Sequence, residues 1–351
     1  MPGDILIYGA NGYTAQLVVE RAVALGARPI LGGRTEARLR PLAARFDLPL
    51  RVFAPADAAL VAGHLAGIRV VLNCAGPFTR TATVMAEACI RARAHYLDIT
   101  GEIDVFEAVA ALGDRAEAAG VMLMPGVGFD VVPSDCLAAH LKRRLPDATR
   151  LVLAFTTSGR PSHGTATTMV ENLHRGARIR RNGRIVAAAA SPALRAVDFG
   201  HGAVPVMPVA WGDVSTAYRT TGIPDIAVYM AAPWPVRVAS RLGGLVPALA
   251  GSARLQNLLK RALDARPGGP DAAARERGRS SLWGEARDAT GATAHARIDT
   301  LEGYALTAIT AWDIARRVAH ADAARPGYRT PAAVFGPDYI LSVPGTARTD
   351  L

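Results

Sequence analysis

The first third of the chain alternates short apolar runs with stretches of helical periodicity. Six apolar runs predict buried strands, at 4–9, 27–33, 50–55, 69–76, 95–101 and 121–128. Helical spacing between them, as in Ala15, Val18, Ala22 and Leu25, predicts further helices near 36–45, 57–66, 82–93 and 103–118. Strands separated by helices are typical of an α/β fold with a doubly wound parallel sheet of the Rossmann type. In such sheets ligands bind at the carboxyl ends of the strands.

The pattern changes after about residue 134. Apolar and alternating segments predict strands at 149–157, 203–211 and 223–231, hairpins at 177–188 (turning at Asn182-Gly183) and 281–300, and helices at 164–173 and 301–319. The later arm of the second hairpin alternates small apolar with polar residues, which indicates a sheet with one covered face. We therefore predict a Rossmann domain over 1–134 and an α+β domain over 135–334 with a mostly antiparallel mixed sheet. The tail, 335–351, is expected to pack back on the first domain.

Composition supports a folded protein of this kind. Half of the 351 residues are hydrophobic and a fifth are charged, which is ordinary for a globular chain of two domains. The three cysteines are scattered, which argues against a zinc site and against a disulfide framework. Without a secretory leader, we expect a cytoplasmic location.

One apolar segment comes closest to a membrane span. Residues 234–263 are rich in leucine and valine but are interrupted by arginine, glycine and proline. The segment is therefore too polar to cross a bilayer, and two packed helices are its simplest interpretation. Peripheral contact with a lipid surface is the alternative.

The positive charge is unevenly distributed. The net charge is +10, and residues 141–200 hold eleven Lys/Arg against three Asp/Glu. Much of this excess falls within 175–184. The run is either a solvated hairpin face or a docking surface for an anionic partner such as an acidic carrier protein. Nucleic acid is not expected, because aromatic residues do not interleave with the arginines.

The stretch GANGYTA joins the first strand to the first helix. Gly9 permits a tight turn, and Gly12 lets the backbone approach a pyrophosphate at the helix N-terminus. Ala15 stands where a third glycine often allows close packing. The other residues of the turn expected to contact the cofactor are Asn11, Tyr13 and Thr14.

An arginine follows the second strand, where folds that bind NAD usually place an acid. Arg34 has no acidic residue before Glu36, and Arg38 lies one helical turn further on. An arginine here is suited to a 2′-phosphate, since a guanidinium binds phosphate oxygens in a bidentate manner. The sequence therefore predicts NADPH rather than NADH.

Three further loops end predicted strands and complete the expected cofactor site. Their expected contacts are Cys74, Ala75, Gly76, Pro77, Phe78, Gly101, Glu102, Gly128 and Phe129. Phe78 is a candidate wall for the nicotinamide. Cys74 lacks a companion histidine and is interpreted as a small buried residue rather than a nucleophile. Neither lysine follows a tyrosine by four residues, so the Tyr-x-x-x-Lys pair of short-chain dehydrogenases is absent.

Taken together, several motifs resemble a known family. GANGYTA, NCAGPF, HYLDITGE and PGVGFDVVPSD are similar to saccharopine dehydrogenase-like NADP-dependent reductases. Downstream, GTATT, VDFG, WGDVSTAYRTTGIPDIAVY and GYRTPAAVFG resemble the trans-acting enoyl reductase branch. The resemblance covers nearly the whole chain. It implies a Rossmann domain, a second α+β domain, NADPH as hydride donor, a homodimer, and an enoyl thioester carried by a polyketide-type synthase as substrate.

Enoyl reduction would need groups that stabilise an enolate oxygen and a source of protons. Candidate donors are Tyr96, His163, Thr165 and the amides at Gly164-Thr165. Asp98 and Glu102 are candidates for positioning water, binding ribose or acid–base work, or they form a loop-capping pair. Asp130 and Asp135 are interpreted as helix caps.

Two alternatives remain open at this point. One is imine reduction of the saccharopine type in amino acid metabolism. The other is a non-catalytic, lipid-associated protein that binds NADP.

Overall fold

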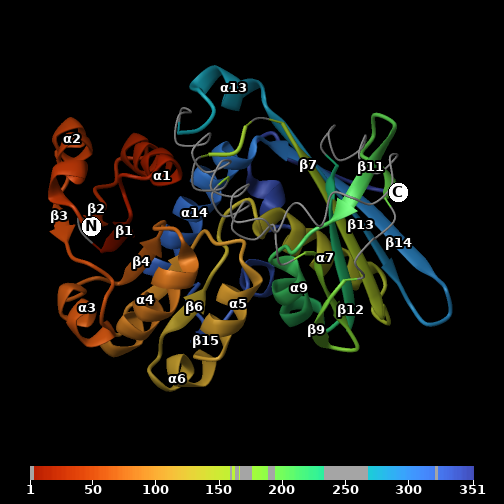
Figure 1. Ribbon diagram of the computed structural model, residues 1–351, viewed down its shortest axis with the longest axis horizontal. Coiled ribbons are helices and arrows are strands. Elements are labelled where there is room, and N and C mark those ends of the chain that lie inside the picture. The colour runs from red at the N-terminus through yellow and green to blue at the C-terminus, as the bar shows by residue number, and fades with distance from the viewer. Residues whose placement is uncertain are drawn as a thin grey trace, which may run out of the picture. The chain divides into compact units, whose positions relative to one another are not determined.

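The computed structural model describes residues 4–158, 160–162, 166, 176–188, 194–232, 268–320 and 323–351 (Figure 1). The chain divides into two compact units. The first comprises Met1–Ala139 and Gly303–Pro344, and the second comprises His140–Glu302 and Gly345–Leu351. The predicted helix at 164–173 and the apolar segment 234–263 lie almost entirely outside the described residues.

The first unit is built on a parallel sheet, as the sequence predicts. Among the described residues it has seven strands in the order β15-β6-β5-β4-β1-β2-β3. Their bounds are β1 Ile5–Tyr8, β2 Ile30–Gly33, β3 Leu50–Val52, β4 Val70–Asn73, β5 His95–Asp98, β6 Met122–Met124 and β15 Gly327–Tyr328. The strand order reverses between β1 and β4, which is the switch point where ligands bind in such sheets.

Helices cover both faces of this sheet (Figure 1). Their bounds are α1 Tyr13–Ala24, α2 Glu36–Phe46, α3 Ala58–His64, α4 Phe78–Ala92, α5 Ile103–Ala110, α6 Gly113–Ala118 and α7 Val132–Arg144, the last crossing the boundary between the units. Alternate strand residues such as Leu6, Val71 and Leu123 form one core with α3 to α6. Because neighbouring strand residues point to opposite faces, Ile7 and Leu72 are left to the other face.

The chain returns to the first unit after the second unit. The returning elements are α14 Gly303–Ala319, β15, α15 Pro331–Phe335 and the 3₁₀ helix η2 Tyr339–Ser342. Helix α14 packs against α1 and contacts β1, β4 and β5. The sequence prediction put 303–334 in the second domain, and the structure instead places it in the first. The periodicity of a helix shows which face is apolar but not which sheet that face covers.

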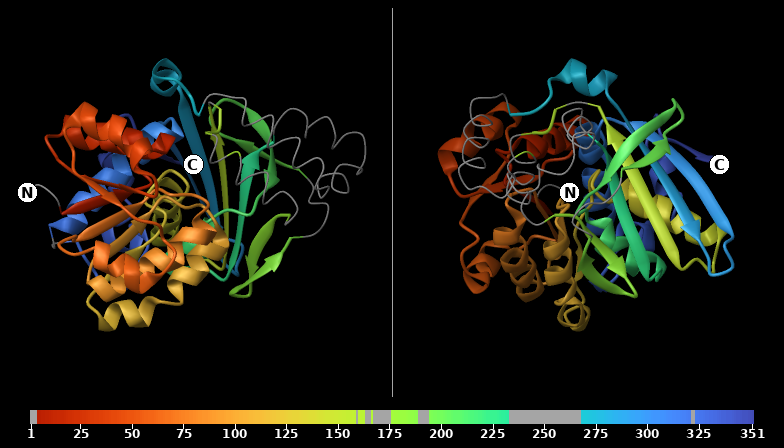
Figure 2. Two further views of the ribbon diagram at one scale, coloured as in Figure 1. Left: turned by 60° about the vertical axis from the view of Figure 1, so that its left-hand side comes forward. Right: turned by 45° about the vertical axis from the view of Figure 1, so that its right-hand side comes forward.

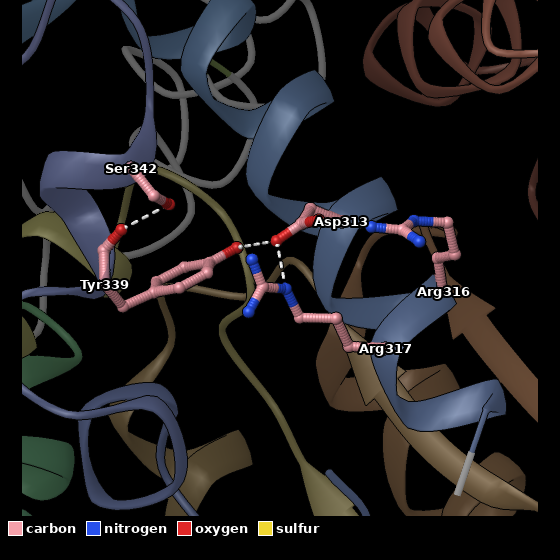
Figure 3. A network of polar contacts seen from close by, with 5 residues as sticks. All are labelled: Asp313, Arg316, Arg317, Tyr339 and Ser342. Atoms are coloured by element: carbon pink, nitrogen blue, oxygen red, sulfur yellow. Dashed lines mark hydrogen bonds and ion pairs between the residues drawn. The ribbon is translucent and has the colours of Figure 1, made fainter. Parts of the chain in front are cut away.

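The tail is fixed to α14 by a polar network (Figure 3). Asp313 Oδ2 accepts from Tyr339 Oη at 3.0 Å and from Arg317 Nε at 2.7 Å, and Asp313 Oδ1 accepts from Arg316 at 3.2 Å. Ser342 Oγ donates to the carbonyl of Tyr339 at 2.7 Å. The first part of the tail, up to Pro344, therefore packs on the first unit, whereas 345–351 belongs to the second.

The second unit contains a mixed sheet, mostly antiparallel as the sequence predicts. Among the described residues the main path runs β10-β11-β12-β7-β13-β14-β16, and the β8–β9 hairpin branches from β12. Only β12 and β7 on this path pair in parallel. The bounds are β7 Arg150–Thr157, β8 Arg178–Arg181, β9 Arg184–Ala187, β10 Arg195–Asp198, β11 Ala203–Pro208, β12 Asp225–Ala231, β13 Arg279–Arg287, β14 Thr293–Leu301 and β16 Ala347–Asp350, with helices α9 Asp213–Thr221 and α13 Ala272–Arg277.

Both hairpins predicted from the sequence are present. Asn182 and Gly183 have positive φ values of 49° and 75°, as a two-residue turn between β8 and β9 requires. The hairpin of β13 and β14 forms two long neighbouring strands, blue in the right-hand view of Figure 2. Val197, Phe199, Val206 and Trp283 form part of the core on one face of this sheet.

Candidate functional site

The glycine turn brings the loops after β1 and β4 into contact. Gly9 has a φ of +80°, and a Cβ placed on it would lie 2.8 Å from the backbone nitrogen of Ala75. Its amide donates to the carbonyl of Gly32 at 2.9 Å, and the amide of Gly12 donates to the carbonyl of Gly9 at 2.9 Å. Any side chain at position 9 would therefore push apart the two loops that flank the switch point of the sheet.

Helix α1 begins at this turn without a side-chain cap from its N-cap residue. The N-cap is Gly12, which makes no side-chain cap hydrogen bond, and the first turn contains no acidic residue. Tyr13 and Thr14 are half-buried there, and the carbonyl of the exposed Asn11 accepts from Gln16 Nε2 at 3.0 Å. A helix N-terminus without an acidic cap favours a bound anion through its amides and its dipole.

Two arginines that follow β2, Arg34 directly after the strand and Arg38 in α2, are available for a ligand. Arg34 and Arg38 are exposed, and in the described part of the chain neither guanidinium has a hydrogen bond or an ion pair. Arg40, on the same helix, differs because it binds Glu36 at 2.6 Å. Burial raises the pKa of Tyr8 to about 12, and the positive charge of Arg34 opposes this rise. The charge of Arg34 therefore lies near Tyr8, at the end of β1.

The loop after β4 is held by buried hydrogen bonds. Asn73 is fully buried, and its Oδ1 accepts from the amide of Ala75 at 3.1 Å. Its Nδ2 donates to Thr81 Oγ1 and to Tyr96 Oη, each at 3.2 Å. Thr81 Oγ1 donates in turn to the carbonyl of Ala75 at 2.7 Å. These hydrogen bonds thus fix the backbone of Ala75, which faces Gly9.

The remaining residues of this loop have mixed environments. Burial, with the charge of Asp98, raises the pKa of the Cys74 thiol far above its usual range, so the thiol stays protonated and is a poor nucleophile. Gly76 is exposed, and Pro77 is the N-cap of α4, whose first turn contains no acidic residue. Phe78 is half-buried and packs against the core of the first unit. Its predicted contact with the nicotinamide stays a prediction.

Tyr96 and Asp98 lie inside the protein rather than in an open cleft. Both are fully buried, and Tyr96 Oη donates to Asp98 Oδ2 at 2.7 Å. Asp98 Oδ1 accepts from the amides of Thr100, at 3.0 Å, and Gly126, at 2.9 Å. Burial raises the pKa of Asp98 to about 6 although these bonds oppose it. The catalytic roles predicted for both residues stay predictions. In the structure, Asp98 joins the loops after β5 and β6, and Tyr96 connects them to Asn73 at the loop after β4.

The loop after β6 is tied to α14. The amide of Phe129 donates to Thr307 Oγ1 at 2.9 Å, and Thr310 Oγ1 donates to the carbonyl of Val127 at 2.8 Å. A Cβ on Gly128 would lie 2.8 Å from Thr307 Cγ2. The glycine is thus explained by the close approach of a helix, and its predicted contact with a cofactor stays a prediction. Sequence reasoning missed these threonines, whose signal is two hydroxyls three residues apart on a buried helix face.

Asp130 lies where the loops after β5 and β6 approach each other. A Cβ on Gly101 would lie 2.6 Å from Asp130 Oδ2, so a side chain there would collide with this carboxyl group. Burial, with the charge of Glu102, raises the pKa of Asp130 to about 7. The sequence suggested a helix cap at Asp130. Asp135 lies within α7 rather than before it, and its Oδ2 accepts from the amide of Ala332 in the first turn of α15 at 2.8 Å.

Other predicted residues are not all placed at this edge. His163 and Thr165 lie outside the described residues, as does Arg175 of the basic segment. Arg180 is buried, with its Nε donating to the carbonyl of Val214 at 2.8 Å and its guanidinium 4.2 Å from the ring centre of Tyr218. This arginine is a structural residue of its hairpin. The described arginines of the segment left on or near the surface are Arg178, Arg181 and Arg184.

Residues 5–124 match the profile of the saccharopine dehydrogenase NADP binding domain. This part of the first unit therefore resembles a saccharopine dehydrogenase NADP-binding domain. The glycine turn, the uncapped α1 and the unpaired arginines all lie in this domain, so its cofactor is NAD(P). These groups suit an anionic dinucleotide, since they offer amides and cations where its phosphates bind.

Relatives in sequence match about two fifths of the chain. A trans-acting enoyl reductase of Mycobacterium leprae is 34% identical over 151 residues, which are 40% of this chain and 36% of that protein. A probable mitochondrial saccharopine dehydrogenase-like oxidoreductase of Arabidopsis thaliana is 30% identical over 154 residues, 38% of this chain and 33% of that protein. The chain thus spans little more than a third of the length of these relatives.

A solved structure matches both units that the chain forms. Apo saccharopine dehydrogenase (L-Glu forming) from Saccharomyces cerevisiae superposes with a TM-score of 0.69 at 14% identity, with 100% of each chain covered. At this identity the match shows the fold alone, so the NADP-binding domain and the mixed sheet together have the saccharopine dehydrogenase fold. In the described parts of the chain, no helix is both long and apolar enough to cross a membrane.

Proposed function

We propose that this protein is an NADPH-dependent oxidoreductase that reduces a C=C bond of an enoyl thioester or of another bulky apolar substrate. The observation that carries the choice of NADPH is Arg34, an exposed cation at the end of β2 with no partner among the described residues. An acid at this place would bind the ribose hydroxyl of NADH and repel a 2′-phosphate. Two unpaired guanidinium groups instead favour the phosphate.

The choice of substrate rests on the relatives. Mycobacterial proteins named trans-acting enoyl reductases match 40% to 48% of this chain at 30% to 34% identity. The Arabidopsis relative, named for saccharopine dehydrogenase, supports imine reduction as the second candidate. Both reactions need the same cofactor bound at the same strand ends.

The chain's own groups have distinct tasks in this proposal. The amides at the start of α1 bind the pyrophosphate, with Gly9 and Gly12 keeping side chains out of its way. Arg34 and Arg38 bind the 2′-phosphate. The buried network of Asn73, Tyr96 and Asp98 positions the loops that face the nicotinamide. Bound NADPH would supply the hydride, and the protein orients it.

Replacing Arg34 tests the cofactor assignment. We expect Arg34→Ala to raise the dissociation constant for NADPH about 10- to 100-fold, since a hydrogen bond between charged groups contributes about 1.5–3 kcal/mol. The constant for NADH should hardly change. Titration of the intrinsic fluorescence of each reduced cofactor measures both. Arg40→Ala is the matched control, because Arg40 is engaged with Glu36. Equal weakening of both cofactors by Arg34→Ala would refute the proposal of NADPH.

A substrate panel tests the reaction. Enoyl thioesters of increasing chain length should support NADPH oxidation, whereas mixtures of a keto acid and an amine should not. The reverse result would favour imine reduction. Tight NADPH binding without oxidation across the whole panel would favour the third alternative, a non-catalytic NADP-binding protein.

The assembly of the protein belongs to the same proposal. We expect a homodimer, to be measured by analytical ultracentrifugation. We also expect the arginines that the basic hairpin leaves on the surface to dock an acidic carrier protein that holds the thioester.

A further inference from the structure

The proposed cofactor site assigns no role to the carboxyl group of Asp130. Asp130 lies in the loop after β6, and the backbone around it is firmly held. The amide of Gly126 donates to Asp98 Oδ1 at 2.9 Å, that of Val127 to the Asp98 carbonyl at 2.8 Å, and that of Phe129 to Thr307 Oγ1 at 2.9 Å. These bonds fix the direction in which the Asp130 side chain leaves the loop.

That side chain lies against the loop after β5. A Cβ on Gly101 would come within 2.6 Å of Asp130 Oδ2 and 3.1 Å of its Cγ, so only glycine leaves room for the carboxyl group. Glu102 follows directly. The charge of Glu102 acts on Asp130 and adds to burial in raising the pKa of that carboxyl to about 7. A group of this kind holds a proton near neutral pH and can release it.

The position of the loop relates Asp130 to the reacting end of the cofactor. A dinucleotide lies across the strand ends in two halves that meet at the switch point. Arg34 marks the β2 side as the adenosine half. The nicotinamide half then falls on the loops after β4, β5 and β6, the last of which contains Asp130.

We propose that Asp130 is the catalytic acid that donates the proton completing the reduction, an inference that rests on the proposed function. The β-carbon of the enoyl thioester would accept the hydride that bound NADPH supplies, and NADP⁺ would remain. The electron pair of the C=C bond moves to give an enolate, and the α-carbon takes the proton from the Asp130 carboxyl. The carboxylate regains a proton from water. Overall, one thioester, one NADPH and one proton give one saturated thioester and one NADP⁺.

Glu102 is a positioning residue in this proposal. Its negative charge disfavours ionisation of Asp130 and so keeps the acid protonated at a higher pH than an isolated aspartate. Removing the charge should lower the pKa of Asp130 and leave its place over Gly101 unchanged.

The test compares Asp130→Asn, Glu102→Gln and the control Asp114→Asn, an exposed residue of α6. With an enoyl thioester that the wild type reduces, we expect Asp130→Asn to lower kcat at least about 100-fold, the lower end of the range for acid–base catalysis. Its dissociation constant for NADPH should stay within twofold of the wild type. The wild-type kcat should fall as pH rises through about 7, because the acid must be protonated. In Glu102→Gln this fall should move to lower pH.

A second measurement does not depend on turnover. The carboxyl carbon of Asp130, followed by ¹³C NMR of aspartate-labelled protein and assigned from its loss in Asp130→Asn, should titrate near pH 7 and shift to lower pH in Glu102→Gln. If the wild type is active and Asp130→Asn keeps its rate and its pH profile, the role of Asp130 is refuted and the proposed function is not. A wild type that oxidises NADPH with no substrate of the panel would overturn the proposed function, and the role of Asp130 with it.

Discussion

Replacing Asp98 removes a side chain that joins the loops after β5 and β6. In Asp98→Ala the amides of Thr100 and Gly126 and the hydroxyl of Tyr96 lose their common acceptor in a fully buried place. Each buried donor left without a partner costs about 1–3 kcal/mol. We therefore expect the first unit to lose about 3–9 kcal/mol of stability, a large fraction of what a domain of this size has.

Asp98→Asn separates the charge of this residue from its hydrogen bonds. An asparagine oxygen can still accept from both amides, whereas its NH₂ group faces the Tyr96 hydroxyl, which is left without an acceptor. The wild type also bears the cost of a buried charge, since the pKa of Asp98 is raised from 3.8 to about 6. A shift of this size corresponds to about 3 kcal/mol. At pH 7 the asparagine variant should thus be far closer in stability to the wild type than the alanine variant.

The pH dependence provides the sharper measurement. Because the folded pKa of Asp98 lies above its unfolded value, the folded state binds more protons between about pH 4 and 6. The contribution of this group to stability is therefore greatest below pH 4 and is lost as pH rises through 6. The wild type should lose about 3 kcal/mol relative to Asp98→Asn between pH 4 and 7.

Hydrogen exchange followed by mass spectrometry can report this unit separately from the second. Peptides covering 95–100 and 122–127 should exchange faster in Asp98→Ala, and the difference between wild type and Asp98→Asn should change with pH. Equal exchange in wild type and Asp98→Ala would refute the role of Asp98 as the common acceptor. A difference from Asp98→Asn that does not change with pH would refute the buried-charge reasoning.

Two further predictions follow from the described geometry. Gly9→Ala should weaken NADPH binding and destabilise the protein by about 1–3 kcal/mol, because the new Cβ would press on Ala75. Gly26 also has a positive φ but has open space around it, so Gly26→Ala should lower stability and leave the affinity for NADPH unchanged. Titration and thermal unfolding measure both, and equal losses of affinity would contradict the role of the turn. Reversing Arg181 and Arg184 to glutamate should slow turnover of a carrier-bound thioester and leave a free thioester unaffected. Equal losses on both substrates would exclude docking at this hairpin.

The parts of the site that sequence predicts well are those determined by neighbouring residues. The turn at Gly9 and Gly12 and the cation at Arg34 follow from residue types at the end of a strand, and the structure shows each where it was expected. Nothing about these positions depends on residues far along the chain. Strand order likewise follows from short connections, which leave a parallel sheet few alternatives.

The roles of Tyr96, Asp98 and Asp130 depend instead on contacts between distant segments. A polar residue at a strand end looks the same in sequence whether it faces a ligand or is buried under the next loop. Here Gly126, twenty-eight residues after Asp98, decides that Asp98 points inward. Thr307 lies 178 residues after Phe129 and fixes its loop. Such pairings are decided by the packing of the complete unit. The pattern of residues within one segment of the sequence therefore cannot predict them.

The return of the chain through α14 and β15 makes the NADP-binding unit discontinuous, and this has a consequence for synthesis. Residues 1–139 lack the helix that covers one face of β1, β4 and β5 and the threonines that hold the loop after β6. During translation this unit cannot finish folding until residues 303–344 have left the ribosome. By then the intervening residues 140–302 have already emerged. Until most of the second unit has been synthesised, one apolar face of β1, β4 and β5 in the nascent first unit therefore stays uncovered.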